Sequence, residues 1–232
     1  MRNDLALYDD LAGVWWDAGG EFAALHWLAD ARAALVPPPV HPGAVLLDVG
    51  CGGGLMAGRL PHGYRHVGVD RTASALVVAA AHGVQVVRGD AAALPVATES
   101  CDVVVAGEIL EHVTDLEGTV REIARVLRPG GLVVIDTIAA TRVARLWLVT
   151  VMEHFPGGPP RSCHDPRLFV DPRRLRDLFA RHSIPLAVRG LRAHIPDYLR
   201  FLTDRRRRVR MRPTRSIAGV YQAIGRKALV HR

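Results

Sequence analysis

Three residues that are able to bind a metal ion lie close together in the sequence: Glu108, Glu111 and His112. On one helical turn, residues spaced i, i+3 and i+4 share a face, so we expect these side chains to point the same way. Two carboxylates and an imidazole suit a divalent ion such as Mg²⁺ or Mn²⁺, which keeps coordination positions open for substrate oxygens. His164 is a candidate to complete the set. The sequence therefore predicts a metal site at Glu108, Glu111, His112 and His164.

A metal-free interpretation of the same residues stays open. In that interpretation Glu108 contacts the surroundings of a cofactor, Glu111 caps a helix or pairs with an arginine, and His112 packs in a half-buried position. In both interpretations His112 and His164 are the candidate catalytic bases, because a neutral imidazole titrates near the pH at which enzymes work.

A glycine-rich turn, residues 48–54, follows the apolar run of residues 45–49. Glycines let the chain turn tightly and let a ligand approach the backbone. Open α/β sheets bind ligands at the carboxyl ends of their strands, which is where this turn lies. Leu55 stands where the dinucleotide fingerprint needs a third Gly or Ala. The turn therefore predicts a ligand site that fits a pyrophosphate poorly.

Two aspartates follow the next two apolar runs. Asp70 ends the second run, where it is placed to accept hydrogen bonds from a ribose diol. Asp90 follows the third, within reach of an adenine amine. Three successive strand ends would then converge on one nucleoside. The alternative is that Asp70 caps the next helix and Asp90 caps a turn, as single aspartates often do.

The elements that position these residues alternate between short apolar runs and helical patterns. Alternation of this kind is typical of a doubly wound, mostly parallel α/β sheet with helices on both faces, here with seven strands. The helical patterns are residues 55–60, residues 73–81 and a segment that ends at Leu127. The predicted strands are residues 45–49, 67–70, 84–87, 102–105, 132–135, 186–188 and 219–224.

The segments outside this alternation suggest four regions. The pattern from Leu5 to Leu35 is helical and ends before the prolines at 37–39. After the fifth strand, residues 139–155 form an apolar helical pattern, and residues 172–182 form another. The regions are an N-terminal helical cap (1–40), a cofactor-binding core (41–138), a substrate-lid insert (139–170) and a C-terminal part that completes the sheet (171–232).

Length and composition limit the class of protein. The chain has 232 residues, enough for one α/β domain with a sizeable core. Its three cysteines are far apart in sequence and odd in number, which argues against a disulfide framework and for packing roles. No apolar run reaches the length of about 18 residues that a membrane span needs. We therefore expect a cytoplasmic protein.

Positive charge is concentrated at one end of the chain. Residues 203–232 hold ten of the 30 basic residues and one of the 23 acidic ones. The run from Arg205 to Arg212 is most often a solvated strand or loop face; anionic lipid is the next interpretation. RNA comes last, because no aromatic residue lies between Arg205 and Arg215 to stack on a base. We therefore do not expect a nucleic-acid partner.

These motifs together resemble the class I S-adenosylmethionine-dependent methyltransferases, and most closely the O-methyltransferases of ubiquinone biosynthesis. The resemblance extends to about residue 175, and the C-terminal third matches poorly. It implies methyl-donor contacts from Arg32, Gly50, Asp70 and Gly107, although a bulkier residue is usual at the position of Gly107. Asp48, Cys51, Gly52, Arg71, Asp90 and Ala91 complete the expected donor site. The matching residues are Trp15 to Asp17, Glu21, Phe22, Leu25, His26, the glycine turn, Glu108, Glu111 to Val113, Pro129 to Gly131, His164, Asp165 and Phe169.

The resemblance implies a Rossmann-like transferase with S-adenosyl-L-methionine as cofactor, active in quinone or secondary-metabolite biosynthesis. Similar Glu-x-x-Glu-His motifs occur in metal-assisted methyltransferases, which supports the divalent cation. We expect a phenol or catechol oxygen of an aromatic, quinone-like small molecule to be ionised and to attack the sulfonium methyl group. The alternatives are an RNA 2′-O-methyltransferase, a C- or N-methyltransferase of a small molecule, and a binding protein without catalysis.

The resemblance also suggests how the acceptor is covered. In the resembling family the segment after strand five belongs to the substrate region and contacts lipid. Here residues 139–155 are expected to form an apolar lid over the acceptor, with peripheral membrane contact through this segment and the basic tail as the alternative. Trp15, Trp16, Phe22 and Trp27 would close the other side of the pocket or pack in the core.

Overall fold

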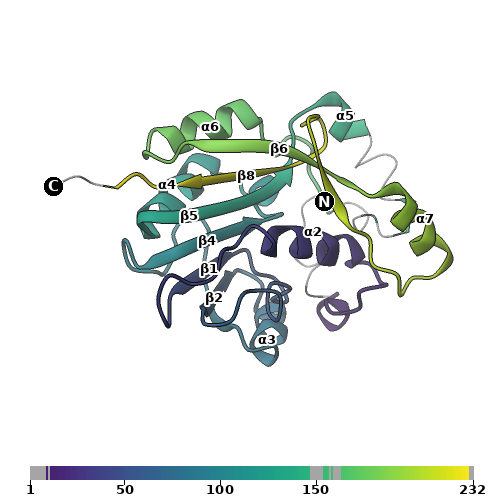
Figure 1. Cartoon of the computed structure of the whole chain (residues 1–232), viewed down its shortest axis with the longest axis horizontal. Coiled ribbons are helices and arrows are strands. Elements are labelled where there is room, and N and C mark those ends of the chain that lie inside the picture. The colour runs from purple at the N-terminus through teal and green to yellow at the C-terminus, as the bar shows by residue number, and fades with distance from the viewer. Residues whose placement is uncertain (1–8, 10, 147–153, 157, 159–162, 230–232) are drawn as a thin grey trace.

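The chain folds around one open sheet, shown in Figure 1. The computed structural model describes residues 9, 11–146, 154–156, 158 and 163–229. Eight strands pair in the order β3-β2-β1-β4-β5-β8-β6-β7, and β1 to β5 run parallel to one another. β8, β6 and β7 join antiparallel, so the predicted α/β class and mostly parallel sheet are confirmed. The strands are β1 (Val45–Val49), β2 (Arg65–Asp70), β3 (Gln85–Arg88), β4 (Cys101–Gly107), β5 (Leu127–Ile138), β6 (Leu186–Ala193), β7 (Met211–Thr214) and β8 (Val220–Arg226).

The prediction of seven strands was one too few. The additional strand, β7, lies in the arginine-rich segment and pairs only with β6. It contains Pro213, which an edge strand tolerates because its outer side needs no ladder hydrogen bonds. Since β7 has no alternating apolar residues, its place in the sheet depends on pairing with β6 and not on a local pattern.

Helices cover both faces of the sheet, and each face has its own apolar core. Alternate residues of the central strands point to opposite faces. On one face Leu47, Val104 and Val133 pack with side chains of α4 and α6. On the other face Leu46 and Val103 pack with side chains of α2 and α3. The helices are α2 (Ala23–Ala33), α3 (Ala73–Ala81), α4 (Leu116–Val126), α5 (Arg142–Ala144), α6 (Pro172–Ala180) and α7 (Ile195–Thr203), with short 3₁₀ turns η1 (Ala12–Val14) and η2 (Leu110–His112).

Two predicted helices differ in the structure. Residues 55–60 form a series of turns, because Gly54 (φ +77°) and Gly58 (φ +70°) adopt left-handed backbone conformations that an α-helix does not contain. Of the helix predicted at 139–155, the structure shows α5 and the residues beside it, while 147–153 lie outside the described residues. Residues 1–8, at the start of the predicted N-terminal helix, also lie outside them. Where the structure is described, it contains no helix long and apolar enough to cross a membrane.

Candidate active site

A large pocket opens at the carboxyl ends of the parallel strands. Its volume is about 740 Å³, which is within the range of small-molecule and cofactor sites. All ten residues predicted to bind the methyl donor line it, together with Glu108, His112 and His164. The ten are Arg32, Asp48, Gly50, Cys51, Gly52, Asp70, Arg71, Asp90, Ala91 and Gly107.

The glycine turn is shaped by left-handed backbone and by a tryptophan packed on it. Gly50 has φ +70° and Gly52 has φ +49°, values that side chains disfavour. A Cβ atom built on Gly52 would lie 2.5 Å from the Trp15 ring. Trp16 Nε1 donates a hydrogen bond to Gly53 O over 2.9 Å. The N-terminal segment therefore packs on this turn. Trp15, Phe22 and Trp27 line the pocket, whereas Trp16 is not among the lining residues and packs against the core.

We expect Gly52→Ala to destabilise the protein and to weaken binding of S-adenosylhomocysteine by at least about tenfold, since Trp15 must move away from the turn. Gly58→Ala is the matched control: its φ of +70° carries the same left-handed strain, about 1–2 kcal/mol, but no atom lies within 4 Å of the added Cβ. Thermal melts and calorimetric titration measure both variants. Equal losses of affinity in the two would contradict the role of the Trp15 contact.

The acids at the strand ends bond to nearby backbone amides and also line the pocket. Asp70 accepts hydrogen bonds from Gly52 N (2.9 Å) and Thr72 N (2.8 Å), so it ties the glycine turn to the start of α3. Asp90 accepts one from Ala92 N over 2.9 Å. Asp70 and Asp90 therefore make backbone contacts of the kind that the capping interpretation predicted. These contacts hold both carboxylates at the pocket wall.

A buried ion pair lies beside the fourth strand. Arg32 Nε and Nη2 donate to the two carboxylate oxygens of Asp136, each over 2.6 Å. Burial would lower the pKa of Arg32, but the Asp136 carboxylate raises it above its usual value. A Cβ on Gly107 would lie 1.7 Å from Arg32 Cζ, so glycine is needed here to make room for the guanidinium. This close approach gives a physical reason for the missing bulkier residue.

Sequence reasoning missed Asp136. Asp136 is fully buried in β5, two residues before the end of the strand. Its position directly after the apolar run 132–135 was the local signal that could have identified it. Its partner Arg32 is 104 residues away in the sequence, and residue spacing over such a separation does not indicate which side chains pair.

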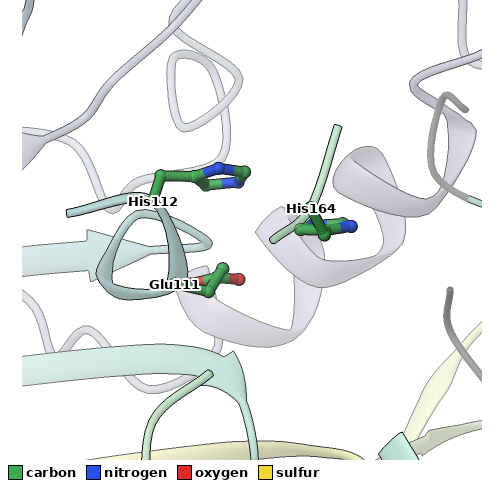
Figure 2. A group of neighbouring side chains, drawn as sticks. All are labelled: Glu111, His112 and His164. Carbon is green, nitrogen blue, oxygen red and sulfur yellow. The ribbon is translucent and has the colours of Figure 1, made fainter. Parts of the chain in front are cut away.

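The predicted metal ligands come together in part. Glu111, His112 and His164 each offer one ligand atom, and these atoms lie within 4.8 Å of one another. Figure 2 shows the His112 ring and the Glu111 carboxylate pointing toward His164. The two imidazole rings stack with centroids 5.1 Å apart. Thr137 Oγ1 donates to Glu111 Oε2 over 2.6 Å and fixes the carboxylate.

Glu108 interacts with Glu111 through its side chain but is not among the three grouped ligands, and it does not share a helical face with them as predicted. Its backbone has φ +52°, and η2 begins only at Leu110, so the i, i+3 geometry of a helix does not apply to it. Burial raises the pKa of Glu108 well above its usual value, and the nearby charges of Glu111 and Asp136 raise it further.

The electrostatics of the group follow from its burial. Burial raises the pKa of Glu111 to about 7, against the lowering effect of the hydrogen bond from Thr137. Burial also lowers the pKa of His112 to about 4, so its imidazole is neutral at pH 7. Cys163 Sγ lies 3.1 Å from His164 Nδ1 and orients that ring. A neutral imidazole beside a pocket is able to accept a proton from a bound hydroxyl group.

The C-terminal part contributes pocket residues that the sequence did not indicate. Ala193, Ile195, Tyr198 and Met211 line the pocket from β6, α7 and β7. With Trp27 on α2 they form a largely apolar wall. The signal for α7 in the sequence was its proline in the first turn and its apolar residues at helical spacing.

Comparisons with known proteins agree with this architecture. Residues 47–135 match the family model described as a methyltransferase domain. The ubiquinone biosynthesis O-methyltransferase of Aeromonas salmonicida is 32% identical over 211 residues, covering 79% of this chain and 86% of that protein. The enzyme of the same name from Idiomarina loihiensis is 33% identical, covering 81% and 82%.

Solved structures show the same fold at lower identity. A methyltransferase from Thermotoga maritima, described as a possible histamine N-methyltransferase, superimposes with a TM-score of 0.65 at 17% identity, covering 96% of this chain and 97% of that one. The geranyl diphosphate C-methyltransferase of Streptomyces coelicolor, solved with Mg²⁺, geranyl diphosphate and S-adenosyl-L-homocysteine, gives 0.60 at 18% identity, covering 86% and 78%.

Proposed function

Because the chain belongs to the family of S-adenosylmethionine-dependent methyltransferases that includes the ubiquinone biosynthesis O-methyltransferases, we propose that it methylates a hydroxyl oxygen of an aromatic, quinone-like small molecule. The methyl donor is S-adenosylmethionine. The oxygen acceptor is supported by the names of the relatives and by one observation in particular: Glu111, His112 and His164 converge beside the donor pocket.

We propose that the ten residues of the pocket wall hold the donor. The glycine turn leaves room for the nucleoside, Asp70 accepts hydrogen bonds from the ribose hydroxyls, and Asp90 lies where the adenine amine would come. The guanidinium of Arg32 is suited to the donor carboxylate, because arginine pairs well with carboxylates. With these roles, we expect the sulfonium methyl group to face the histidines.

The three grouped residues also fit a divalent cation such as Mn²⁺ or Mg²⁺. Glu111 Oε1 is buried and accepts no hydrogen bond within the described part of the chain, so a carboxylate lone pair is available. One carboxylate and two imidazoles form a mixed oxygen and nitrogen donor set that divalent transition metals accept. When bound, such a cation lowers the pKa of a phenol oxygen and favours its ionised form.

The residues of the chain supply orientation and proton transfer. His112 is neutral at pH 7, and its one free lone pair accepts the proton of the acceptor hydroxyl when it is not holding a cation. The oxygen then forms a bond to the methyl carbon as the carbon–sulfur bond breaks, which yields a methyl ether and S-adenosylhomocysteine. Holding the oxygen and the methyl carbon in line is the main contribution of the pocket to the rate.

The purified chain, incubated with S-adenosylmethionine and a catechol such as 3,4-dihydroxybenzoate, is expected to produce a methyl ether, because a cation held by the grouped side chains would bind two neighbouring oxygens. Mass spectrometry and NMR identify the atom that is methylated. Binding of S-adenosylhomocysteine without methylation of any catechol or hydroquinone oxygen would contradict the acceptor class and leave the donor site intact. Methylation of carbon or nitrogen would contradict it as well.

A further inference from the structure

His66 places a buried imidazole nitrogen next to a carboxylate of the pocket wall. Its Nε2 atom lies 3.4 Å from Asp48 Oδ2, and the two side chains are 10% and 4% exposed. This nitrogen makes no hydrogen bond within the described part of the chain. A buried polar atom without a hydrogen bond lowers stability, so its presence needs an explanation. A shift of about 0.3 Å would bring the two atoms within ordinary hydrogen-bond distance.

The register of the first two strands brings these side chains together. β1 and β2 run parallel, with Leu46 beside His66 and Asp48 beside Gly68. Residues two apart on a strand share a face, so His66 and Asp48 lie diagonally on the same face of the sheet. Gly68 is the direct neighbour of Asp48 and has no side chain to stand between them. The imidazole therefore reaches the carboxylate across the strand pair.

Asp48 differs from the other two acids that follow the parallel strands, which backbone amides hold in place. The amides that follow Asp48 in the glycine turn, Gly50 N and Cys51 N, both donate to Val69 O. They are therefore occupied and do not fix the Asp48 carboxylate. His66 is the side chain that is placed to orient it.

Asp48 also lies beside the proposed position of the amino-acid part of the donor. It lines the pocket, and its charge raises the pKa of Arg32, so the two groups are near each other. In the proposed function Arg32 holds the carboxylate of the donor, and the present inference rests on that assignment. The carboxylate and the ammonium group of the donor are attached to the same carbon atom. A carboxylate close to Arg32 is therefore suited to bind the ammonium group.

We propose that His66 is a positioning residue of the donor site, which turns the Asp48 carboxylate toward the ammonium group of S-adenosylmethionine. With its proton on Nε2, the imidazole donates to one carboxylate oxygen and leaves the other oxygen to the ligand. His66 is not among the residues that line the pocket, so it acts through Asp48. Its effect is confined to ligands that carry the ammonium group.

Substitutions at His66 separate this role from simple packing. His66→Leu keeps an apolar side chain of similar size in the buried position but removes the N–H donor. It should weaken binding of S-adenosylhomocysteine about tenfold, because a hydrogen bond to a charged group is lost. His66→Gln keeps an N–H donor at a similar distance from the backbone and should recover most of the affinity, whereas the shorter His66→Asn should not. Calorimetric titration measures all three variants.

A second ligand distinguishes loss of the contact from loss of the fold. 5′-Methylthioadenosine has the nucleoside and the sulfur of the donor but neither its ammonium group nor its carboxylate. The wild type and His66→Leu should bind it with equal affinity, whereas a distorted pocket would bind both ligands more weakly. No methyl acceptor is present in these titrations, so their outcome is independent of the proposed O-methylation.

A double variant tests whether His66 acts through Asp48. Asp48→Asn should weaken binding of S-adenosylhomocysteine, and Asp48→Asn/His66→Leu should bind it no more weakly than Asp48→Asn alone. His41→Leu is the matched control, since it removes a contact of 3.3 Å between His41 Nε2 and Asp102 Oδ1 outside the pocket; affinity should not change.

Three results would overturn the role of His66: full affinity in His66→Leu, equal weakening of the two ligands in that variant, or additive losses in the double variant. Unchanged affinity for S-adenosylhomocysteine in Asp48→Asn would overturn it too, and would also contradict the orientation proposed for the donor. A loss in Asp48→Asn without a loss in His66→Leu would contradict the role of His66 alone.

Discussion

An Asp136→Leu variant is expected to have a free energy of unfolding about 3–5 kcal/mol below that of the wild type, because it leaves the Arg32 guanidinium buried without its carboxylate. Both side chains are buried, and they share two hydrogen bonds of 2.6 Å. The guanidinium fills the space that a Cβ atom at Gly107 would occupy, so it is closely packed against the backbone there. Urea unfolding followed by tryptophan fluorescence measures the loss.

A double variant separates stability from donor binding. Arg32→Met/Asp136→Leu replaces the buried pair by apolar side chains, a change that is often neutral for stability. It should recover most of the unfolding free energy and still bind S-adenosylhomocysteine at least about tenfold more weakly, because Arg32 is proposed to hold the donor carboxylate. As a surface control, Glu117→Gln in the exposed pair with Arg181 should change stability by less than about 1 kcal/mol. Full affinity in the double variant would remove Arg32 from the donor site.

The parallel half of the sheet was predictable because its signals are local. The helix predicted at residues 73–81 is α3, and the strand predicted at 45–49 is β1. Each buried parallel strand is a short apolar run, and each helix begins soon after the strand ends. The same rule explains why all ten expected donor residues line one pocket: parallel strands that alternate with helices bring their carboxyl ends to one edge.

At the antiparallel end of the sheet, the strands predicted at 186–188 and 219–224 correspond to β6 and β8, whereas β7 and α7 were not predicted. β7 holds its place through its pairing with β6, from Gly190 with Thr214 to Ala193 with Met211, and no alternation in its own residues shows this. α7 is short and no helix was predicted for it, while the run that follows, Arg205 to Arg212, was interpreted as a solvated face. Tertiary contacts, such as Phe201 against Trp27, decide both elements.

Within the site, the sequence identified the candidate metal-binding side chains but not how they are arranged in space. Helical spacing predicted that Glu108 and Glu111 share a helical face, yet Glu108 has a left-handed backbone and meets Glu111 without belonging to the three grouped candidate ligands. The backbone conformation of this one residue decides where its side chain lies, and the spacing of residues in the sequence does not reveal that conformation. The partnership of Thr137 with Glu111 depends likewise on β5 lying beside η2, a contact between distant segments.

Glu111→Gln should lower the rate of methyl transfer by about a hundredfold or more and leave the fold intact. Glu111 is the one carboxylate in the grouped set, so its amide would bind a divalent cation far more weakly. It does not line the pocket, so affinity for S-adenosylhomocysteine should not change. Steady-state kinetics across a series of Mn²⁺ concentrations, with calorimetric binding of S-adenosylhomocysteine alongside, measures both effects.

Thr137→Val is the graded companion to this variant, because it removes only the hydrogen bond that orients the Glu111 carboxylate. Partners that orient metal ligands contribute about 10- to 100-fold in metal affinity or activity, so this variant should need more Mn²⁺ and recover its rate when the metal is saturating. Wild-type enzyme treated with EDTA should lose activity and regain it with Mn²⁺. Turnover that resists the chelator would remove the cation from the mechanism. A large rate loss in Glu111→Gln under those conditions would then assign the carboxylate to orienting the neighbouring histidines, because it would act without any metal to hold.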